Sequence, residues 1–411
     1  MDNELIVNIE KMVFGGDGLA HLPDGRAVFV PFVLPGETVR IQMIEDKPRF
    51  ARGNLLEIIV TSPKRIKPRC KHFGNCGGCH YQHIPYDEQL IIKMEVLRDQ
   101  LMRIGKLGDL QVNDIIPSPD QWHYRNHLQF HVSGQGSLCF TGTNGRNLVA
   151  IEECHLPQPG INDTWPQIKL EPGSRIERLA IRQDSRDEIM LLFEGKEYSI
   201  PDFELDMPIS ATYLSPEGLT LNLAGEDAQL FLSGIHELRV SPESFFQVNN
   251  AQADAMVEYV RSLIGIVKEK RLFLELFSGV GLFSVILAKE ADKLVAFESS
   301  PSACYDFVAN LDCFDNIDLY EGLVEEILPG LELSPDLVLL DPPRAGLEKA
   351  ARMALANLGC PQVIYVSCDP ATLARDLAYL CNAGYEVRSM QPFDMFPQTY
   401  HVECICHLVR K

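Results

Sequence analysis

The chain has 411 residues, more than one ordinary domain holds, so two or three domains are expected. With 46% hydrophobic and 23% charged residues, no apolar run near the length of a membrane span and no signal-peptide pattern, it is expected to be a cytoplasmic globular protein. The formal net charge of −20 argues against nucleic-acid binding unless positive charge is concentrated locally.

Residues 1–61 are predicted to form a small β-domain. Short runs rich in β-branched residues are separated by glycine and proline turns, and strands are expected at 6–9, 27–30, 38–41 and 55–60. Several short strands at this spacing suggest a barrel of the OB type, a fold that often binds oligonucleotides.

A basic strip overlaps the end of this segment. Between positions 47 and 71 only Glu57 opposes eight cationic side chains, namely Lys47, Arg49, Arg52, Lys64, Arg65, Lys67, Arg69 and Lys71. A basic strip on an acidic body suits a protein that binds RNA at one place, whereas an isolated charge run is more often a solvated loop.

Residues 62–240 are predicted to form a mainly β central domain, in which a helix over 86–103, with apolar residues at helical spacing, comes before the strands. An aromatic and basic run in this domain supplies either contacts to RNA bases or a strand edge packed on the core, through Trp122, His123, Tyr124, Arg125 and His127.

A cysteine cluster lies at the start of the central domain. Cys76 and Cys79 are separated by two residues, Cys70 lies six positions before Cys76, and Cys154 is the candidate fourth ligand. A disulfide framework is not expected without a signal peptide. Four thiolates suit either zinc or an iron–sulfur cluster, and the spacing leaves both open.

Residues 241–411 are predicted to form a doubly wound, Rossmann-like α/β domain. Near-continuous apolar strands are expected at 272–276, 294–297, 337–340 and 363–366, with helices that include 252–264 and 282–288. The final run, 403–409, is expected to add an antiparallel edge strand.

Three motifs follow strands of this domain. A glycine turn at 277–281 comes after the first strand, and Glu298 ends the next, a pairing that favours an adenosine cofactor. Asp341 begins a rigid Asp-Pro-Pro-Arg corner. Cys368 follows the fourth strand as a candidate nucleophile, and Glu403, before the last strand, is a candidate general base.

Together these features resemble the RNA uridine-5-methyltransferase family, in the branch with an N-terminal TRAM domain. The turn at 15–20 looks like TRAM, and the run 244–249 is similar to a segment whose glutamine touches S-adenosylmethionine. The resemblance implies a [4Fe-4S] cluster on Cys70, Cys76, Cys79 and Cys154. It also implies cofactor contacts from Gln247, Phe277, Glu298 and Asp341. Leu282 stands where the family often has a polar residue, which puts one cofactor contact in doubt.

The resemblance implies that S-adenosylmethionine methylates carbon 5 of a uridine in folded RNA, with Cys368 bonded to carbon 6 and Glu403 as the base. The target base would be flipped out of its stack. Large-subunit (23S) ribosomal RNA is the favoured substrate and transfer RNA the alternative; neither a membrane nor a protein partner is expected.

Three other readings are open. A cytidine-5 or adenine-amino RNA methyltransferase would share the fold, and the adenine enzyme would not need Cys368. A radical methylthiotransferase would also carry TRAM, but it uses a Cys-x3-Cys-x2-Cys spacing. A non-catalytic RNA-binding or chaperone protein on a methyltransferase fold would have no reason to keep both Cys368 and Glu403.

Overall fold

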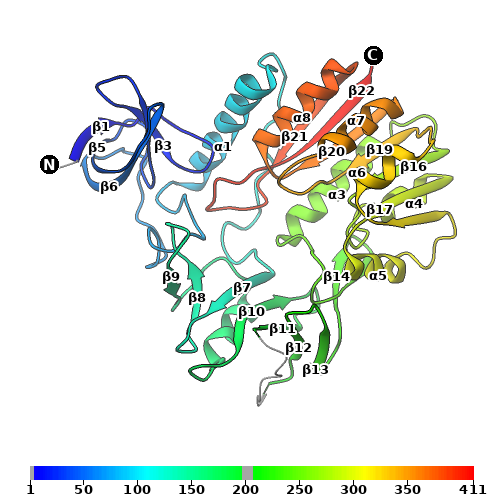
Figure 1. Ribbon diagram of the computed structural model, residues 1–411, viewed down its shortest axis with the longest axis horizontal. Helices are drawn as coiled ribbons and strands as arrows, with labels where there is room; N and C mark the ends of the chain where they lie inside the picture. The colour runs from blue at the N-terminus through cyan, green and yellow to red at the C-terminus, as the bar shows by residue number, and fades with distance from the viewer. Residues whose placement is uncertain (1–3, 197–206) are drawn as a thin grey trace.

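The computed structural model describes residues 4–196 and 207–411, arranged as three β-rich parts (Figure 1). In these two ranges, no helix is both long and apolar enough to cross a membrane. The three-part, mixed α/β and β architecture expected from the sequence is confirmed, whereas the boundaries at 61 and 240 stay predictions.

The N-terminal part is a six-stranded half-barrel in the order β1-β5-β6-β4-β3-β2. All four predicted strands are present, and the short β2 and β3 are additional. Val28, Val30 and Ile41 are fully buried and form its core. The strands are β1 (Glu4–Asn8), β2 (Lys11–Met12), β3 (Gly18–His21), β4 (Ala27–Val30), β5 (Thr38–Asp46) and β6 (Phe50–Val60).

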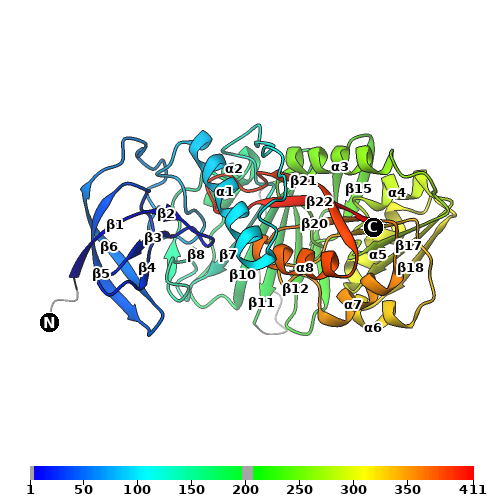
Figure 2. The same ribbon diagram turned by 90° about the horizontal axis from the view of Figure 1, so that it is seen from above.

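The cysteine-rich loop leads into α1 (Tyr86–Gln100), which continues as one π-helical turn, η1 (Leu101–Gly105). The helix predicted over 86–103 is confirmed. Leu97 and Leu101 are buried in the core of the C-terminal sheet, where α1 and η1 pack on α8 (Figure 2). By packing, this helix belongs to the C-terminal part, although it precedes the central sheet in the chain.

The central part is a seven-stranded sheet in the order β13-β12-β11-β10-β7-β8-β9, joined to a β14–β15 hairpin. Only the β11–β12 pair is parallel. Its elements are β7 (His127–Val132), β8 (Leu138–Thr141), β9 (Leu148–Ala150), α2 (Pro159–Thr164), η2 (Trp165–Gln167), β10 (Ile176–Gln183), β11 (Ile189–Gly195), β12 (Ser210–Leu214), β13 (Thr220–Ala224), β14 (Gln229–Ser233) and β15 (His236–Val240).

The C-terminal part is a seven-stranded sheet in the order β18-β17-β16-β19-β20-β22-β21. The first five strands are parallel, and their apolar side chains feed two cores, one under α3, α4 and α5 and one under α6, α7, α8 and α1. The predicted doubly wound arrangement is therefore confirmed.

The helices and strands of this part alternate along the chain. They are α3 (Asn250–Ile264), β16 (Leu272–Leu276), α4 (Ser284–Glu290), β17 (Lys293–Glu298), α5 (Pro301–Asn310), β18 (Ile317–Glu321), α6 (Val324–Ile327), η3 (Leu328–Gly330), β19 (Leu337–Leu340), α7 (Lys349–Leu358), β20 (Gln362–Ser367), α8 (Pro370–Asn382), β21 (Tyr385–Phe393) and β22 (Glu403–Arg410).

One expectation about the last strand is wrong. β22 is antiparallel, as predicted, but it lies inside the sheet between β20 and β21. The edge is formed by β21. After β21 the chain makes a long loop and returns as β22, which pairs between β21 and β20. Because β22 is paired on both sides and buried on both faces, its first residue, Glu403, is held firmly.

Candidate active site

The candidate active site forms at the carboxyl edge of the parallel strands. Leu276, at the end of β16, is in register with Phe297 of β17 and with Leu340 of β19. The glycine turn, Glu298 and Asp341 therefore follow neighbouring strands at one edge, where open α/β sheets bind their ligands.

Cys368 and Glu403 meet through the antiparallel pairing of β20 with β22. Ser367 pairs with Cys404, so Cys368, one residue further on, comes opposite Glu403, one residue earlier. Cys368 is half-buried, and Glu403 is buried. The next residue, Asp369, caps α8 by accepting hydrogen bonds from the backbone N–H groups of Ala371 and Thr372, both at 2.9 Å.

The electrostatic environment of this pair is predominantly acidic. Burial, followed by the charges of Glu403 and Asp341, raises the pKa of the Cys368 thiol to about 12, while Arg344 acts in the opposite direction. Burial and then Asp341 raise the pKa of Glu403 to about 8, again opposed by Arg344. Burial alone raises the pKa of Asp341 to about 7. Arg344 thus favours the thiolate form of Cys368 and the carboxylate form of Glu403.

Two of these carboxylates lack direct partners. Among the residues that the structure describes, no side chain or backbone donor forms a hydrogen bond to the carboxylate of Asp341 or Glu403. Asp341 is half-buried and Glu403 is buried. Acidic groups without a bound donor in such places suit a cationic ligand, and the sulfonium of S-adenosylmethionine is a cation.

The glycine turn and Glu298 form one unit. The Gly279 N–H donates to Glu298 Oε2 at 2.8 Å, and Glu298 Oε1 accepts from the N–H groups of Ser299 and Ser300. Gly281 has a positive φ of 98°, a conformation that residues other than glycine rarely adopt, so the turn favours glycine there. Phe277 has a positive φ of 64°, a conformation that is strained for an aromatic residue and is often found at ligand sites.

Gln247 lies in the segment between β15 and α3, where it is half-buried. Two positions earlier, Phe245 is 70% exposed between the buried Ser244 and Phe246. The sequence analysis did not single out Phe245, because a phenylalanine beside another phenylalanine reads as core. Only its exposure in a segment that is otherwise largely buried marks it as available for stacking on a base.

The loop before Glu403 receives contacts from several parts of the chain. Lys93 of α1 forms a fully buried ion pair with Asp394, with 2.5 Å between Nζ and Oδ1. The backbone N–H groups of His80 and Tyr81 donate to the Gln398 carbonyl oxygen. The Tyr124 hydroxyl donates to the Pro397 carbonyl oxygen at 3.0 Å. These contacts fix the loop that delivers Glu403.

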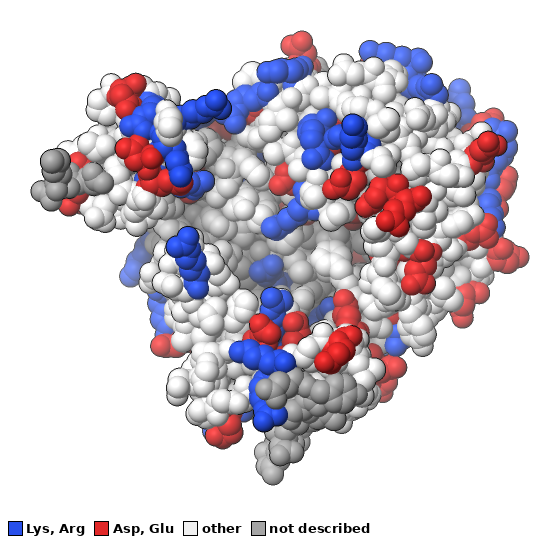
Figure 3. Space-filling view, viewed as in Figure 1, with Lys and Arg blue, Asp and Glu red and all other residues white. Residues whose placement is uncertain are grey.

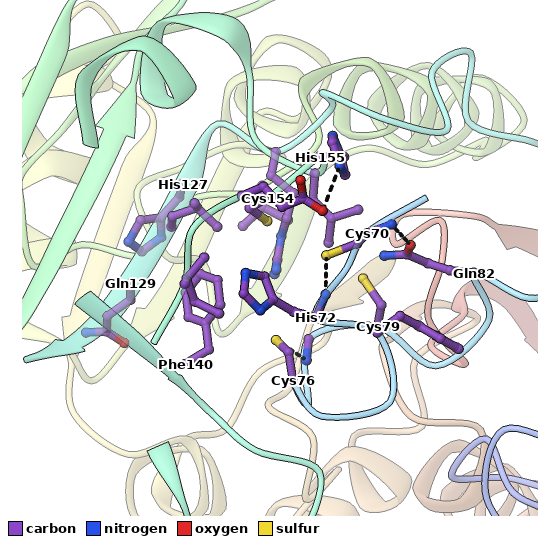
Figure 4. Close-up of a pocket in the computed structure, with 18 residues that line it drawn as sticks. Cys70, His72, Cys76, Cys79, Gln82, His127, Gln129, Phe140, Cys154 and His155 are labelled. Carbon is purple, nitrogen blue, oxygen red and sulfur yellow. Dashed lines mark hydrogen bonds and ion pairs between the residues drawn. The ribbon is translucent and has the colours of Figure 1, made fainter. Parts of the chain in front are cut away.

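The four predicted cluster ligands line one cavity of about 310 Å³ (Figure 4), and Cys368 is not among the residues that line it. Within residues 4–196 and 207–411, no three His, Cys, Asp or Glu side chains converge as a single metal ion would require. Cys70, Cys76, Cys79 and Cys154 instead surround a space that Phe140 and His127 also line.

The basic strip is more neutral than the sequence indicates. Five of its eight cations form ion pairs with carboxylates, mostly distant in sequence: Lys47 with Glu45, Arg52 with Asp17, Lys64 with Glu88, Arg65 with Glu37 and Lys71 with Glu152. The Arg65 pair is buried and structural. Figure 3 nevertheless shows Lys and Arg side chains inside a central hollow, whereas acidic groups gather over the C-terminal part.

The candidate base-contacting residues of the central part have different roles. Tyr124 is buried, whereas His127 is half-buried, and desolvation lowers the pKa of His127 to about 3. Trp122 is half-buried, and the Arg69 guanidinium lies 5.3 Å from its ring centroid. Arg125 lies over Phe396, in the loop before Glu403. Core packing therefore accounts for Tyr124, whereas His127 lines the cysteine cavity.

Comparisons with known proteins agree with this arrangement. A family model described as tRNA (Uracil-5-)-methyltransferase matches residues 233–411, and a TRAM domain model matches residues 3–56. Uncharacterized RNA methyltransferases of Thermotoga maritima and Aquifex aeolicus are 32% and 30% identical, over 98% and 99% of both chains.

A solved structure is similar over almost the full length. The crystal structure of Pyrococcus abyssi tRNA (uracil-54, C5)-methyltransferase in complex with S-adenosyl-L-homocysteine has a TM-score of 0.77 and 25% identity, covering 98% of this chain and 100% of that one. This chain therefore belongs to the TRAM-containing family of RNA uracil-5-methyltransferases, and it is an S-adenosylmethionine-dependent RNA (uracil-C5)-methyltransferase.

Proposed function

We propose that the enzyme methylates one uridine of a structured RNA through a covalent bond between Cys368 and carbon 6, with Glu403 as the base. The observation that carries this proposal is the β20–β22 register, which brings Cys368 opposite Glu403 at the edge where Asp341 and the glycine turn also lie. Both groups are needed because carbon 5 of uracil is a poor nucleophile.

The reaction assigns one step to each group. The Cys368 thiolate attacks carbon 6, and the ring electrons move to the carbon-4 oxygen, which makes carbon 5 nucleophilic. S-adenosylmethionine would supply the methyl group to carbon 5, with its methyl–sulfur bond breaking and S-adenosylhomocysteine as the leaving group. Glu403 then takes the proton from carbon 5, the double bond re-forms, and the carbon–sulfur bond breaks to release the Cys368 thiolate.

We assign the cofactor contacts to Gln247, Phe277, Glu298 and Asp341. Glu298 ends the strand after the glycine turn, where a carboxylate can accept from ribose hydroxyls. Asp341 adds negative charge close to the reacting atoms, which suits the sulfonium.

A 5-fluorouridine RNA tests the covalent step, because fluorine at carbon 5 leaves no proton for Glu403 to remove. The wild-type enzyme is expected to form an adduct that survives a denaturing gel, and Cys368→Ser is expected to form none. Cys313→Ser, which alters an exposed free cysteine, is the matched control and should form the adduct. A Cys368→Ser variant that still forms the adduct would reject this mechanism.

Large-subunit (23S) ribosomal RNA is the proposed substrate, from the pairing of TRAM with a cluster site. Transfer RNA is the second candidate, because the similar Pyrococcus abyssi enzyme is named for uracil-54 of tRNA. Mass-spectrometric mapping of 5-methyluridine in both RNAs from a deletion strain separates them. A mark lost only from tRNA would reject the ribosomal assignment.

We also propose that Cys70, Cys76, Cys79 and Cys154 hold a [4Fe-4S] cluster and that the enzyme acts in the cytoplasm. The sulfur atoms surround a cavity and do not meet at one point, which favours a multi-atom cluster over a single zinc. Four protein thiolates would leave no open iron, so a structural role follows. Iron, sulfide and zinc analysis of anaerobically purified protein tests this, and one zinc without iron would contradict it.

A further inference from the structure

Residues 241–249, here called the cofactor segment, lie between β15 and α3, carry Gln247 and are held by the central sheet. Arg182 of β10 is only 7% exposed. Its guanidinium donates to three backbone carbonyl oxygens of the segment: Ser241 at 3.1 Å, Pro242 at 3.3 Å and Ser244 at 2.9 Å. No carboxylate of the described residues forms an ion pair with it. A buried guanidinium that loses its hydrogen-bond acceptors costs free energy. The three carbonyl groups of the segment are therefore stabilised in their present positions.

The opposite side of the same turn is held by Asp306 of α5, which is fully buried. Its carboxylate accepts from the Ser241 N–H at 2.7 Å, the Ser241 hydroxyl at 2.8 Å and the Ser244 hydroxyl at 2.6 Å. Helix α5 starts three residues after Glu298, so Asp306 connects the cofactor segment to the strand end proposed to hold the ribose.

A third contact fixes the segment at Gln247 itself. The Asn126 side-chain amide donates to the Gln247 carbonyl oxygen at 2.8 Å, and the Asn126 N–H donates to the Val248 carbonyl oxygen at 2.9 Å. Asn126 is buried and immediately precedes β7 of the central sheet. The central sheet thus grips the cofactor segment at both ends.

We infer that Arg182 and Asp306 are positioning residues for S-adenosylmethionine: they clamp the cofactor segment between the central sheet and α5 and thereby set cofactor affinity. The inference rests on the proposed contact between Gln247 and the cofactor. Neither residue touches the reacting atoms. Without the clamp, the segment is ordered only when the cofactor binds, and that ordering reduces the observed affinity.

Calorimetric titration with S-adenosyl-L-homocysteine, together with steady-state kinetics, tests the clamp. Arg182→Gln keeps one amide donor in place of three contacts, and it is expected to raise the Kd and the KM for S-adenosylmethionine about tenfold, equivalent to about 1.4 kcal/mol. The kcat at saturating cofactor and the KM for RNA should stay within about twofold of wild type, because the clamp contacts neither the reacting atoms nor the central hollow.

Matched variants separate positioning from general damage. Arg178→Gln, on the same strand but partly exposed and paired with Glu194, should leave every constant unchanged. Arg182→Lys should fall between wild type and Arg182→Gln, because one ammonium cannot span three carbonyls. Ser244→Ala removes one hydrogen bond to Asp306 and should raise the Kd about threefold with the melting temperature preserved; this variant decides the matter if Arg182→Gln does not fold.

Two results would overturn the inference. One is a wild-type Kd in both Arg182→Gln and Ser244→Ala. The other is a KM for RNA that rises in parallel with the Kd for cofactor, since that would indicate a displaced central sheet. Failure of the wild-type enzyme to bind S-adenosyl-L-homocysteine at all would instead contradict the proposed function.

Discussion

At the scale of single residues, Glu403 offers the most direct test of the proton-transfer step. Glu403→Gln keeps the shape of the side chain but cannot accept the carbon-5 proton, so turnover should fall about 100-fold to 10,000-fold. The bond to Cys368 should still form, and a covalent complex with ordinary uridine RNA should accumulate on a denaturing gel. A Gln variant with turnover within tenfold of wild type would assign the base to another group.

The raised pKa of Glu403 predicts how activity depends on pH. The base acts only when ionised, and its pKa of about 8 in the free enzyme means that kcat/KM should rise with pH across that value. Arg344→Gln removes the cation that lowers this pKa, so the midpoint should move upward. A pH–rate profile of both proteins checks this, and a midpoint that moves downward in the variant would be inconsistent with the role of Arg344.

The same carboxyl group also makes the free energy of unfolding depend on pH, and its contribution decreases as the pH rises. Its pKa rises from 4.5 to about 8 on folding, so the folded state holds a proton that the unfolded chain has released between these values. The stabilisation is full below about 4.5 and is lost as the pH rises through about 8. Glu403→Gln should therefore flatten the dependence of the unfolding free energy on pH over this range, as chemical denaturation can measure.

At the scale of elements, the buried Lys93–Asp394 pair joins α1 to the loop before Glu403. Lys93→Met leaves the Asp394 carboxylate buried without its cation, and its Oδ2 already lacks a partner. The unfolding free energy should fall by about 3 to 5 kcal/mol. Adding Asp394→Leu should recover most of the loss in denaturation experiments; no recovery would mean that the pair acts through the loop conformation itself.

Local sequence patterns were sufficient to predict most helices and strands of the C-terminal sheet. The strands at 272–276 and 337–340 have the predicted bounds, because continuous apolar runs between turns are typical of buried parallel strands. β21 was not predicted, since its polar and apolar residues follow no single period, and for that reason β22 was placed at the edge. Cys368 and Glu403 were identified as candidates, but their adjacency depends on a register between strands that the sequence does not encode locally.

At the scale of the whole molecule, the ion pairs of the basic strip could not be predicted from short stretches of sequence. The basic strip loses much of its charge to Asp17, Glu37, Glu88 and Glu152, which folding brings to it from other parts of the chain. The clamp around Arg182 was missed for a similar reason, because its three carbonyl partners lie about 60 positions away. Contacts of this kind arise from topology, and periodicity cannot reveal them.

The cysteine segment 70–79 connects all three parts. Phe73 packs edge-on against Phe32 of the half-barrel, with ring centroids 5.1 Å apart. The Gly77 N–H donates to the Thr141 carbonyl oxygen of the central sheet at 3.0 Å. Directly after the segment, His80 and Tyr81 donate to Gln398 in the loop before Glu403. The way in which the three parts are joined therefore depends on how firmly this segment is fixed.

Removal of one proposed cluster ligand should disturb this connection. Cys76→Ala is expected to lower the melting temperature and to weaken RNA binding at least about tenfold, because a segment tied by only three thiolates no longer fixes the half-barrel against the central sheet. Cys313→Ser is the matched control, since that thiol is exposed and free. Thermal unfolding and RNA titration measure both effects, and a Cys76→Ala protein with wild-type melting and RNA affinity would show that the cysteines do not organise the RNA-binding surface.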